Sequence, residues 1–123
     1  MAIDPVLLAV LDAFPMQFDD LGAMTAQELR AVFEGRDPPP GEDVASVEDL
    51  EVPGPGGTLP VRVYRPEGAA DPAPVVVFFH GGGWVLGSIA THDASCRGFA
   101  NRTGAVHVSV DYRLAPEHPY PAA

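Results

Sequence analysis

The 123-residue sequence contains no lysine and one cysteine, and it has no long hydrophobic run. All seven basic residues are arginines, against 17 acidic residues, so the formal net charge is −10 at pH 7. This surplus of negative charge argues against nucleic-acid binding through phosphate contacts. The lack of lysine excludes a Gly-Lys-Ser/Thr phosphate loop. Because Cys96 stands alone, no disulfide can form within the chain, which favours a reducing, cytoplasmic location.

The longest uninterrupted aliphatic or aromatic run is residues 75–79, far below the roughly 20 residues of a membrane-spanning helix. The N-terminal "MAIDPVLLAVLDAF" has no basic flank and is interrupted by Asp4 and Asp12, so we do not expect a signal peptide. Residues 1–51 carry 12 acidic residues and 2 arginines, whereas the rest carries 5 of each. The excess charge is therefore expected to form a solvated acidic face of the N-terminal segment.

Two helices are predicted in that segment. An Asp-Pro pair suited to a helix start predicts a short helix over residues 4–14. In "MTAQELRAVFEG", Thr25 and Glu28 have the spacing of a capping box, and Gly35 stands where a helix should end.

The proline-rich "RDPPPGED" predicts a boundary between a helical segment, residues 1–40, and a second unit, residues 41–123. Residues 44–52 and 59–64 read as two strands around "PGPGG", which predicts an antiparallel pair. The next part predicts an α/β crossover. "VVVFF" suits a strand covered on both faces of a parallel sheet, a helix is expected over residues 91–102, and "AVHVSV" is a second strand.

The stretch "FFHGGGWVLGS" places three glycines directly after the apolar strand. One interpretation is a dinucleotide site, because Gly81, Gly83 and Gly87 follow a strand and Asp111 closes the next one. That site expects a helix to begin within the glycines, whereas "WVLGSIATHD" delays the helix. The other interpretation is an oxyanion hole, in which glycine N–H groups bind the charge that develops on an ester oxygen. This second interpretation accounts for the strand, the glycines and the late helix together.

The motifs "HGGGWVLGS", "THDASCR" and "VSVDYRLAPEHPYPAA" resemble those of the hormone-sensitive-lipase-like family of α/β-hydrolases, which includes microbial carboxylesterases. The resemblance implies the N-terminal portion of an α/β-hydrolase fold, with antiparallel first strands followed by a parallel strand-helix-strand unit. The helical segment before it resembles that family's N-terminal cap over the active site. The implied substrate is a small-molecule ester, with no metal or cofactor.

Carried over by position, the resemblance implies that the N–H groups of Gly82 and Gly83 bind the oxyanion and that Gly81 allows the bend. His80 would brace the loop by hydrogen bonding and would not act as the catalytic base. Trp84 would either shape the substrate pocket or pack beneath the loop.

Three residues of "DYRLAPE", namely Asp111, Arg113 and Glu117, would form a supporting charge network behind the loop.

The nucleophile of this family stands in Gly-x-Ser-x-Gly, and none of Ser46, Ser88, Ser95 and Ser109 does. Cys96, in the middle of a predicted helix, is not expected to be a catalytic thiol. We therefore expect an N-terminal part of an esterase that is inactive alone. A dinucleotide-binding fragment and a non-catalytic interaction module stay open as alternatives.

Overall fold

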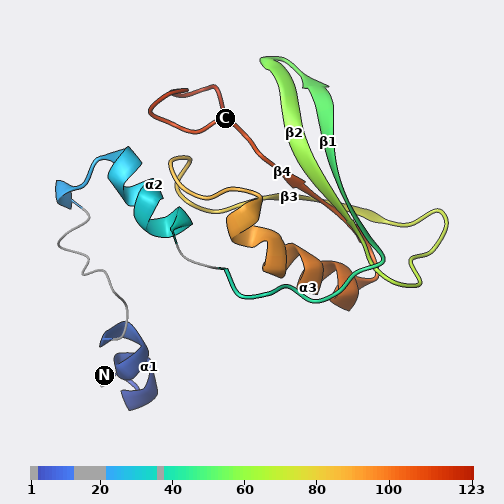
Figure 1. Cartoon of the computed structure of the whole chain (residues 1–123), viewed down its shortest axis with the longest axis horizontal. Helices are drawn as coiled ribbons and strands as arrows, with labels where there is room; N and C mark the ends of the chain where they lie inside the picture. The colour runs from blue at the N-terminus through green and yellow to red at the C-terminus, as the bar shows by residue number, and fades with distance from the viewer. Residues whose placement is uncertain (1–2, 13–21, 36–37) are drawn as a thin grey trace.

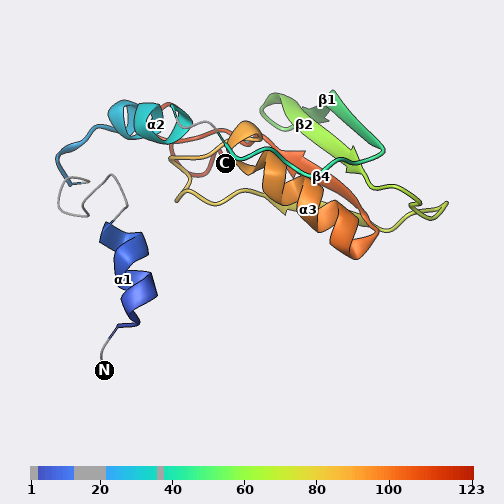
Figure 2. The same cartoon turned by 60° about the horizontal axis from the view of Figure 1, so that its bottom comes forward.

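A computed structural model describes residues 3–12, 22–35 and 38–123. Its centre is a four-stranded mixed sheet with the strand order β1-β2-β4-β3 (Figure 1). The helix α3 covers one face of the sheet, and the helix α2 lies beside the loops at one end (Figure 2).

The first two strands, β1 (Ser46–Gly54) and β2 (Gly57–Arg65), form the predicted antiparallel pair. Both strands extend two residues further into "PGPGG" than expected, since pairing continues to Gly54 opposite Gly57. Gly57 has φ +116°, a conformation that favours glycine and lets the chain reverse within two residues.

The predicted crossover is also confirmed, because β3 (Val75–Phe79) and β4 (Val106–Val110) pair in parallel and α3 (Asp93–Thr103) connects them. A single 3-10 turn, Ala90–His92, precedes α3, so the α-helix begins later than predicted. At its other end Gly104 adopts the left-handed conformation, φ +69°, that closes many helices.

The buried core lies between α3 and the sheet. Tyr64, Cys96 and Ala100 are inaccessible to solvent, and Val47 and Phe78 pack against them. The Tyr64 hydroxyl donates to Asp93 Oδ1 at 2.9 Å, so the first turn of α3 is tied to β2 through a partly buried carboxylate.

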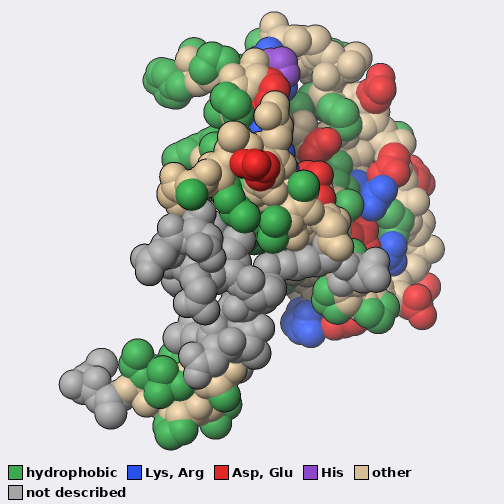
Figure 3. Space-filling model, turned by 60° about the vertical axis from the view of Figure 1, so that its left-hand side comes forward, with side chains coloured by type: hydrophobic (Ala, Val, Ile, Leu, Met, Phe, Trp, Pro, Cys, Tyr) green, Lys and Arg blue, Asp and Glu red, His purple; other side chains and the backbone are tan. Residues whose placement is uncertain are grey.

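The N-terminal helices are α1 (Pro5–Asp12) and α2 (Ala26–Glu34). The predicted capping box is present in α2, where Thr25 Oγ1 accepts from the Glu28 N–H and the Glu28 carboxylate accepts from the Thr25 N–H. The last two residues of the first predicted helix, 13 and 14, lie outside the described residues. In both ribbon views α1 lies away from the sheet, and Figure 3 shows its hydrophobic side chains at the surface.

The segment after the predicted boundary is bound to the core. Glu42 accepts hydrogen bonds from Asn101 and Arg102 of α3 through its two carboxylate oxygens, at 3.1 and 2.9 Å. The main chain of residues 41–43 therefore runs along α3, as the ribbon shows (Figure 1).

The strand "VVVFF", whose apolar run is typical of a strand covered on both faces, lies at the edge of the sheet in this chain. Val75, Val77 and Phe79 are 61%, 55% and 63% exposed. The reason is topological, because β3 is an edge strand and pairs only with β4 among the described residues. A strand at the edge of a sheet has backbone N–H and C=O groups without a neighbouring strand, and here its apolar side chains are exposed to solvent as well.

Candidate active site

The glycine loop, residues 81–87, follows β3 and turns back on itself through backbone hydrogen bonds. The Gly82 carbonyl accepts from the N–H groups of Val85 at 3.1 Å and of Leu86 at 2.9 Å. Three successive residues, Gly82, Gly83 and Trp84, have positive φ values of 130°, 62° and 61°. A side chain at Gly82 would bring its Cβ 2.0 Å from the Leu86 carbonyl oxygen, so the sequence needs glycine there.

The N–H groups of Gly82 and Gly83 have no hydrogen-bond acceptor among the described residues. Backbone N–H groups are strong donors and rarely lack partners unless water or a ligand reaches them. Both glycines are exposed. The loop therefore presents two adjacent, unoccupied donors to the outside.

His80, directly after β3, is buried, and its ring lies against the glycine loop. Its Nδ1 lies 2.9 Å from the Gly81 carbonyl oxygen and 3.3 Å from the Tyr112 hydroxyl. Tyr112 donates its own proton to the His80 carbonyl at 2.6 Å. Both neighbours of Nδ1 can then act only as acceptors, so Nδ1 carries the proton. The rings of His80 and Tyr112 also stack, with 4.3 Å between their centroids.

A cavity of about 610 Å³ lies beside the loop. Its walls come from the glycine loop, from the start of the crossover connection and from the N-terminal segment: Phe33, Pro38, Pro39, Gly81, Gly82, Leu86, Gly87, Thr91 and His92. The lining is mostly apolar, with the backbone of the glycine loop on one side. This composition suits a site for the apolar part of a small organic molecule.

The family resemblance implied an N-terminal cap over the site, but the individual cap residues and His92 could not be assigned to this cavity from the sequence. Phe33 and the prolines come from far along the chain, and no local pattern gives their position. The His92 side chain approaches Thr91 Oγ1 at 3.0 Å and stacks on the His80 ring at 5.4 Å. It therefore forms part of the wall that surrounds the loop.

The predicted partners behind the loop do not form the common network that we expected. Glu117 forms a two-pronged ion pair with Arg30 of α2, at 2.8 Å for each contact. Arg113 instead donates to the Ala122 carbonyl at 2.9 Å, and Asp111 lies beside a different cavity. Long-range packing of α2 against the loops supplies a cation for Glu117 that the motif alone does not reveal.

Trp84 does not pack beneath the loop, since it is 68% exposed. Its positive φ turns the side chain outward, and its carbonyl accepts from the Ala115 N–H at 2.8 Å. The alternative role, a contribution to substrate binding, stays a prediction.

Ser88 and Cys96, which could be mistaken for nucleophiles, are placed in ways that do not suit that role. Ser88 and Thr91 exchange hydrogen bonds at the start of the 3-10 turn, with Ser88 Oγ accepting from the Thr91 N–H at 3.2 Å. Cys96 is inaccessible to solvent, and burial raises the pKa of its thiol, which disfavours the reactive thiolate.

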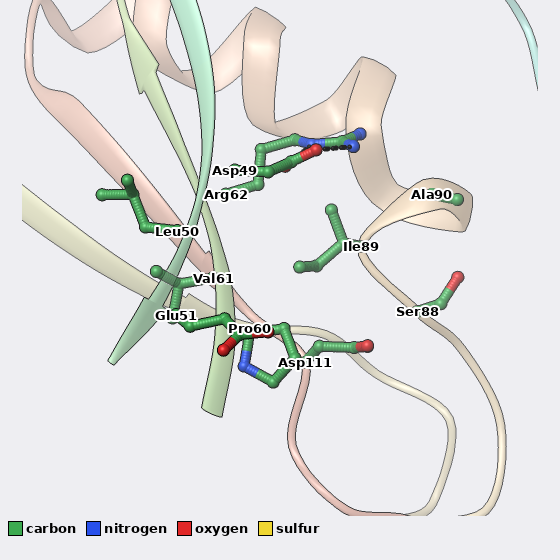
Figure 4. Close-up of a pocket in the computed structure, with 10 residues that line it drawn as sticks. All are labelled: Asp49, Leu50, Glu51, Pro60, Val61, Arg62, Ser88, Ile89, Ala90 and Asp111. Carbon is green, nitrogen blue, oxygen red and sulfur yellow. Dashed lines mark hydrogen bonds and ion pairs between the residues drawn. The ribbon is translucent and has the colours of Figure 1, made fainter. Parts of the chain in front are cut away.

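A second cavity, of about 500 Å³, opens between the hairpin and residues 88–90 (Figure 4). At one end Asp49 and Arg62 face each other as an ion pair, with Arg62 Nε 2.6 Å from Asp49 Oδ1. Asp111 lies at the other end, beside Pro60. This cavity lies apart from the glycine loop and shares no lining residue with the first cavity.

The dinucleotide interpretation fits poorly with the position of α3. The helix begins at Asp93, ten residues after Gly83, so its N-terminus is not built from the glycines. That N-terminus already holds a carboxylate, because Asp93 accepts from Arg62 at 3.1 Å and from Arg97 at 2.6 Å. A pyrophosphate there would meet negative charge.

Comparison with known proteins gives one consistent result. Residues 76–123 match a family model described as the alpha/beta hydrolase fold. Esterase LipI of Mycobacterium tuberculosis is 50% identical over 99% of this chain and 38% of the relative. Carboxylesterase NlhH of the same organism is 46% identical over 98% of this chain and 38% of the relative. The solved hyperthermophilic esterase from the archaeon Pyrobaculum calidifontis superposes with a TM-score of 0.78 at 44% identity, covering 100% of this chain and 40% of that chain. The chain thus spans about two fifths of the length of these relatives.

Proposed function

We propose that this chain, which belongs to the α/β-hydrolase fold family, contributes the oxyanion hole and one wall of the substrate site of a serine carboxylesterase. The resemblance to hormone-sensitive-lipase-like esterases is confirmed by relatives that are themselves named as esterases. The observation that carries the proposal is the pair of N–H groups, on Gly82 and Gly83, that have no acceptor among the described residues. Gly82 lines a largely apolar cavity, and Gly83 follows it directly.

In the proposed reaction a serine from a longer form of the protein attacks the ester carbonyl, and the carbonyl oxygen becomes an oxyanion. The N–H groups of Gly82 and Gly83 donate hydrogen bonds to that oxygen in both tetrahedral intermediates. The bend that we expected at Gly81 depends on Gly82 instead, because Gly81 has an ordinary backbone and room for a side chain. His80 holds the loop from behind, and Trp84 contacts substrate from the outer side. Residues 1–40 act as a cap whose Phe33 covers the apolar cavity, while residues 41–123 form the beginning of the hydrolase core.

The partner proposed here is a small-molecule ester, with neither a metal nor another cofactor. Among the described residues, no helix has the length and apolar character to cross a membrane. Absence of nucleic-acid binding and a cytoplasmic location stay predictions, which rest on the net charge and on the single cysteine.

A chimera tests the proposal directly. Residues 1–123 would replace the matching region of the NlhH carboxylesterase, whose remaining sequence would supply the nucleophile. We expect this chimera to hydrolyse p-nitrophenyl butyrate, whereas residues 1–123 alone should not. In the chimera, Gly83→Ala should lower kcat/KM by about tenfold or more, since removal of one oxyanion donor costs about 10²–10³ in rate and a displaced donor costs less.

The matched control is Gly68→Ala. Gly68 and Gly83 have nearly equal φ values, 67° and 62°, and neither would bring a Cβ within 4 Å of other atoms. The two substitutions therefore carry a similar conformational cost, but only Gly83 lies in the loop. Equal turnover in the two variants would refute the assignment of the donor. A folded chimera without activity would favour the interaction-module alternative.

A further inference from the structure

Arg30 of α2 donates hydrogen bonds from all three nitrogens of its guanidinium group, one of them to the glycine loop. Its Nε donates to the Val85 carbonyl at 2.7 Å, and its two terminal nitrogens reach the Glu117 carboxylate at 2.8 Å. One of those nitrogens also donates to the Ala115 carbonyl. The side chain is only 17% exposed, so this arrangement differs from an ordinary surface ion pair.

The loop needs support from outside itself. Trp84 is a non-glycine residue at φ +61°, an unfavourable conformation that persists only when the surroundings impose it. Two successive carbonyls supply the points of attachment. The Trp84 carbonyl accepts from the Ala115 N–H, and the Val85 carbonyl accepts from Arg30.

Arg30 also sets the position of the cavity wall. Phe33 lies three residues further along α2, so it projects from the same side of the helix one turn later. Phe33 and Gly82 line the same cavity. Fixing Arg30 against Val85 therefore fixes the distance between the apolar wall and the loop.

We infer that Arg30 is the positioning residue that couples the N-terminal helix to the glycine loop and holds the Gly82 and Gly83 N–H groups in their donor geometry. This inference rests on the proposed function, because it assigns the donor geometry a role in ester hydrolysis. The guanidinium is required because its planar fork presents several N–H donors in fixed directions. A lysine ammonium carries its three rotatable donors on a single nitrogen, so it does not reproduce the spread-out fork that contacts two carbonyls and a carboxylate here.

The test on this chain is amide hydrogen exchange at low protein concentration. The reporters are the Val85 and Leu86 amides, which donate to the Gly82 carbonyl, and the Ala115 amide, which donates to Trp84. We expect Arg30→Met to accelerate their exchange by about tenfold or more, since hydrogen bonds to charged groups stabilise a structure more than neutral ones do. The Asp111 amide, which donates to the Pro60 carbonyl at the sheet, should keep its exchange rate and thereby report that the core is folded.

Two variants sharpen the result. Arg30→Lys should not restore slow exchange, because charge alone does not replace the fork. Arg102→Met removes an ion pair with Glu42 that is largely exposed and should leave the loop amides unchanged. Unchanged exchange in Arg30→Met, or full rescue by Arg30→Lys, would overturn the inference and leave the proposed function standing.

A second measurement links the residue to the reaction. In the chimera with NlhH, Arg30→Met should lower kcat more than it changes KM, because the oxyanion contact forms only in the transition state. A change in KM alone would overturn the positioning role and would indicate that Arg30 serves only the cavity wall.

Discussion

Gly82→Ala should open the turn of the glycine loop, whereas the same change one residue earlier should not. At Gly82 a Cβ would lie 2.0 Å from the Leu86 carbonyl oxygen and 2.5 Å from its carbon, and the φ of 130° is unfavourable for alanine. At Gly81 nothing lies within 4 Å of the added Cβ, and the backbone is in an ordinary region. The two variants therefore differ in sterics at neighbouring positions of one motif.

The expected change in the free energy of opening the loop follows from the hydrogen bonds that Gly82→Ala must break. The clash is with backbone atoms of Leu86, so it cannot be relieved by moving a side chain. The turn must open, and the two hydrogen bonds to the Gly82 carbonyl are lost. At about 1 kcal/mol each, their loss lowers the free energy of opening by about 2 kcal/mol. Gly81→Ala should be neutral or stabilising by about 0.4–1 kcal/mol, through lower entropy of the unfolded chain.

The assay is hydrogen exchange of the Leu86 amide, with the Asp111 amide as the reporter of the sheet. A change of about 2 kcal/mol corresponds to an acceleration of roughly 30-fold at Leu86 in Gly82→Ala. Gly81→Ala should show no acceleration. Equal acceleration in both variants would refute the steric argument, because it would mean that any Cβ in the glycine run disturbs the loop.

Three further outcomes are expected. Burial alone would raise the pKa of Asp93, but hydrogen bonds from Arg97, Tyr64 and Arg62 outweigh it and hold the pKa below its usual value. The stability that Asp93 contributes is therefore present above the unfolded-state pKa, about 3.9, and is lost as pH falls through the lower folded-state value. Urea unfolding should show that Asp93→Asn costs about 2 kcal/mol at pH 7 and weakens the acid dependence, while Asp71→Asn in an exposed loop does neither. Val77→Thr on the edge strand β3 should reduce concentration-dependent aggregation measured by light scattering, since it removes exposed apolar surface; unchanged aggregation would mean that another surface drives it. Cys96 should react with a thiol reagent only as fast as the chain unfolds, and rapid labelling of the native chain would contradict its burial.

The local elements followed from short-range signals. The capping box of α2 is visible because Thr25 and Glu28 are three residues apart and interact within one turn. The hairpin around "PGPGG" and the strand-helix-strand unit follow from turn residues and apolar runs that are equally local. The glycine motif also predicted a loop with open N–H donors, because backbone freedom at Gly82 is a property of the residue itself.

Tertiary structure decided which distant groups meet at that loop. Arg30 and Glu117 are 87 positions apart, and no spacing rule connects them. Their pairing arises because α2 lies against the loops, and the same placement brings Phe33 into the cavity. The exposure of β3 was likewise set by strand order, because an apolar run has the same sequence whether it lies inside a sheet or at its edge. The sequence by itself determined the helices, the strands and the position of the glycine loop, because the signals for each of them act over a few residues. The cavity wall, the Arg30 contacts and the open edge depend on contacts between segments that only folding brings together.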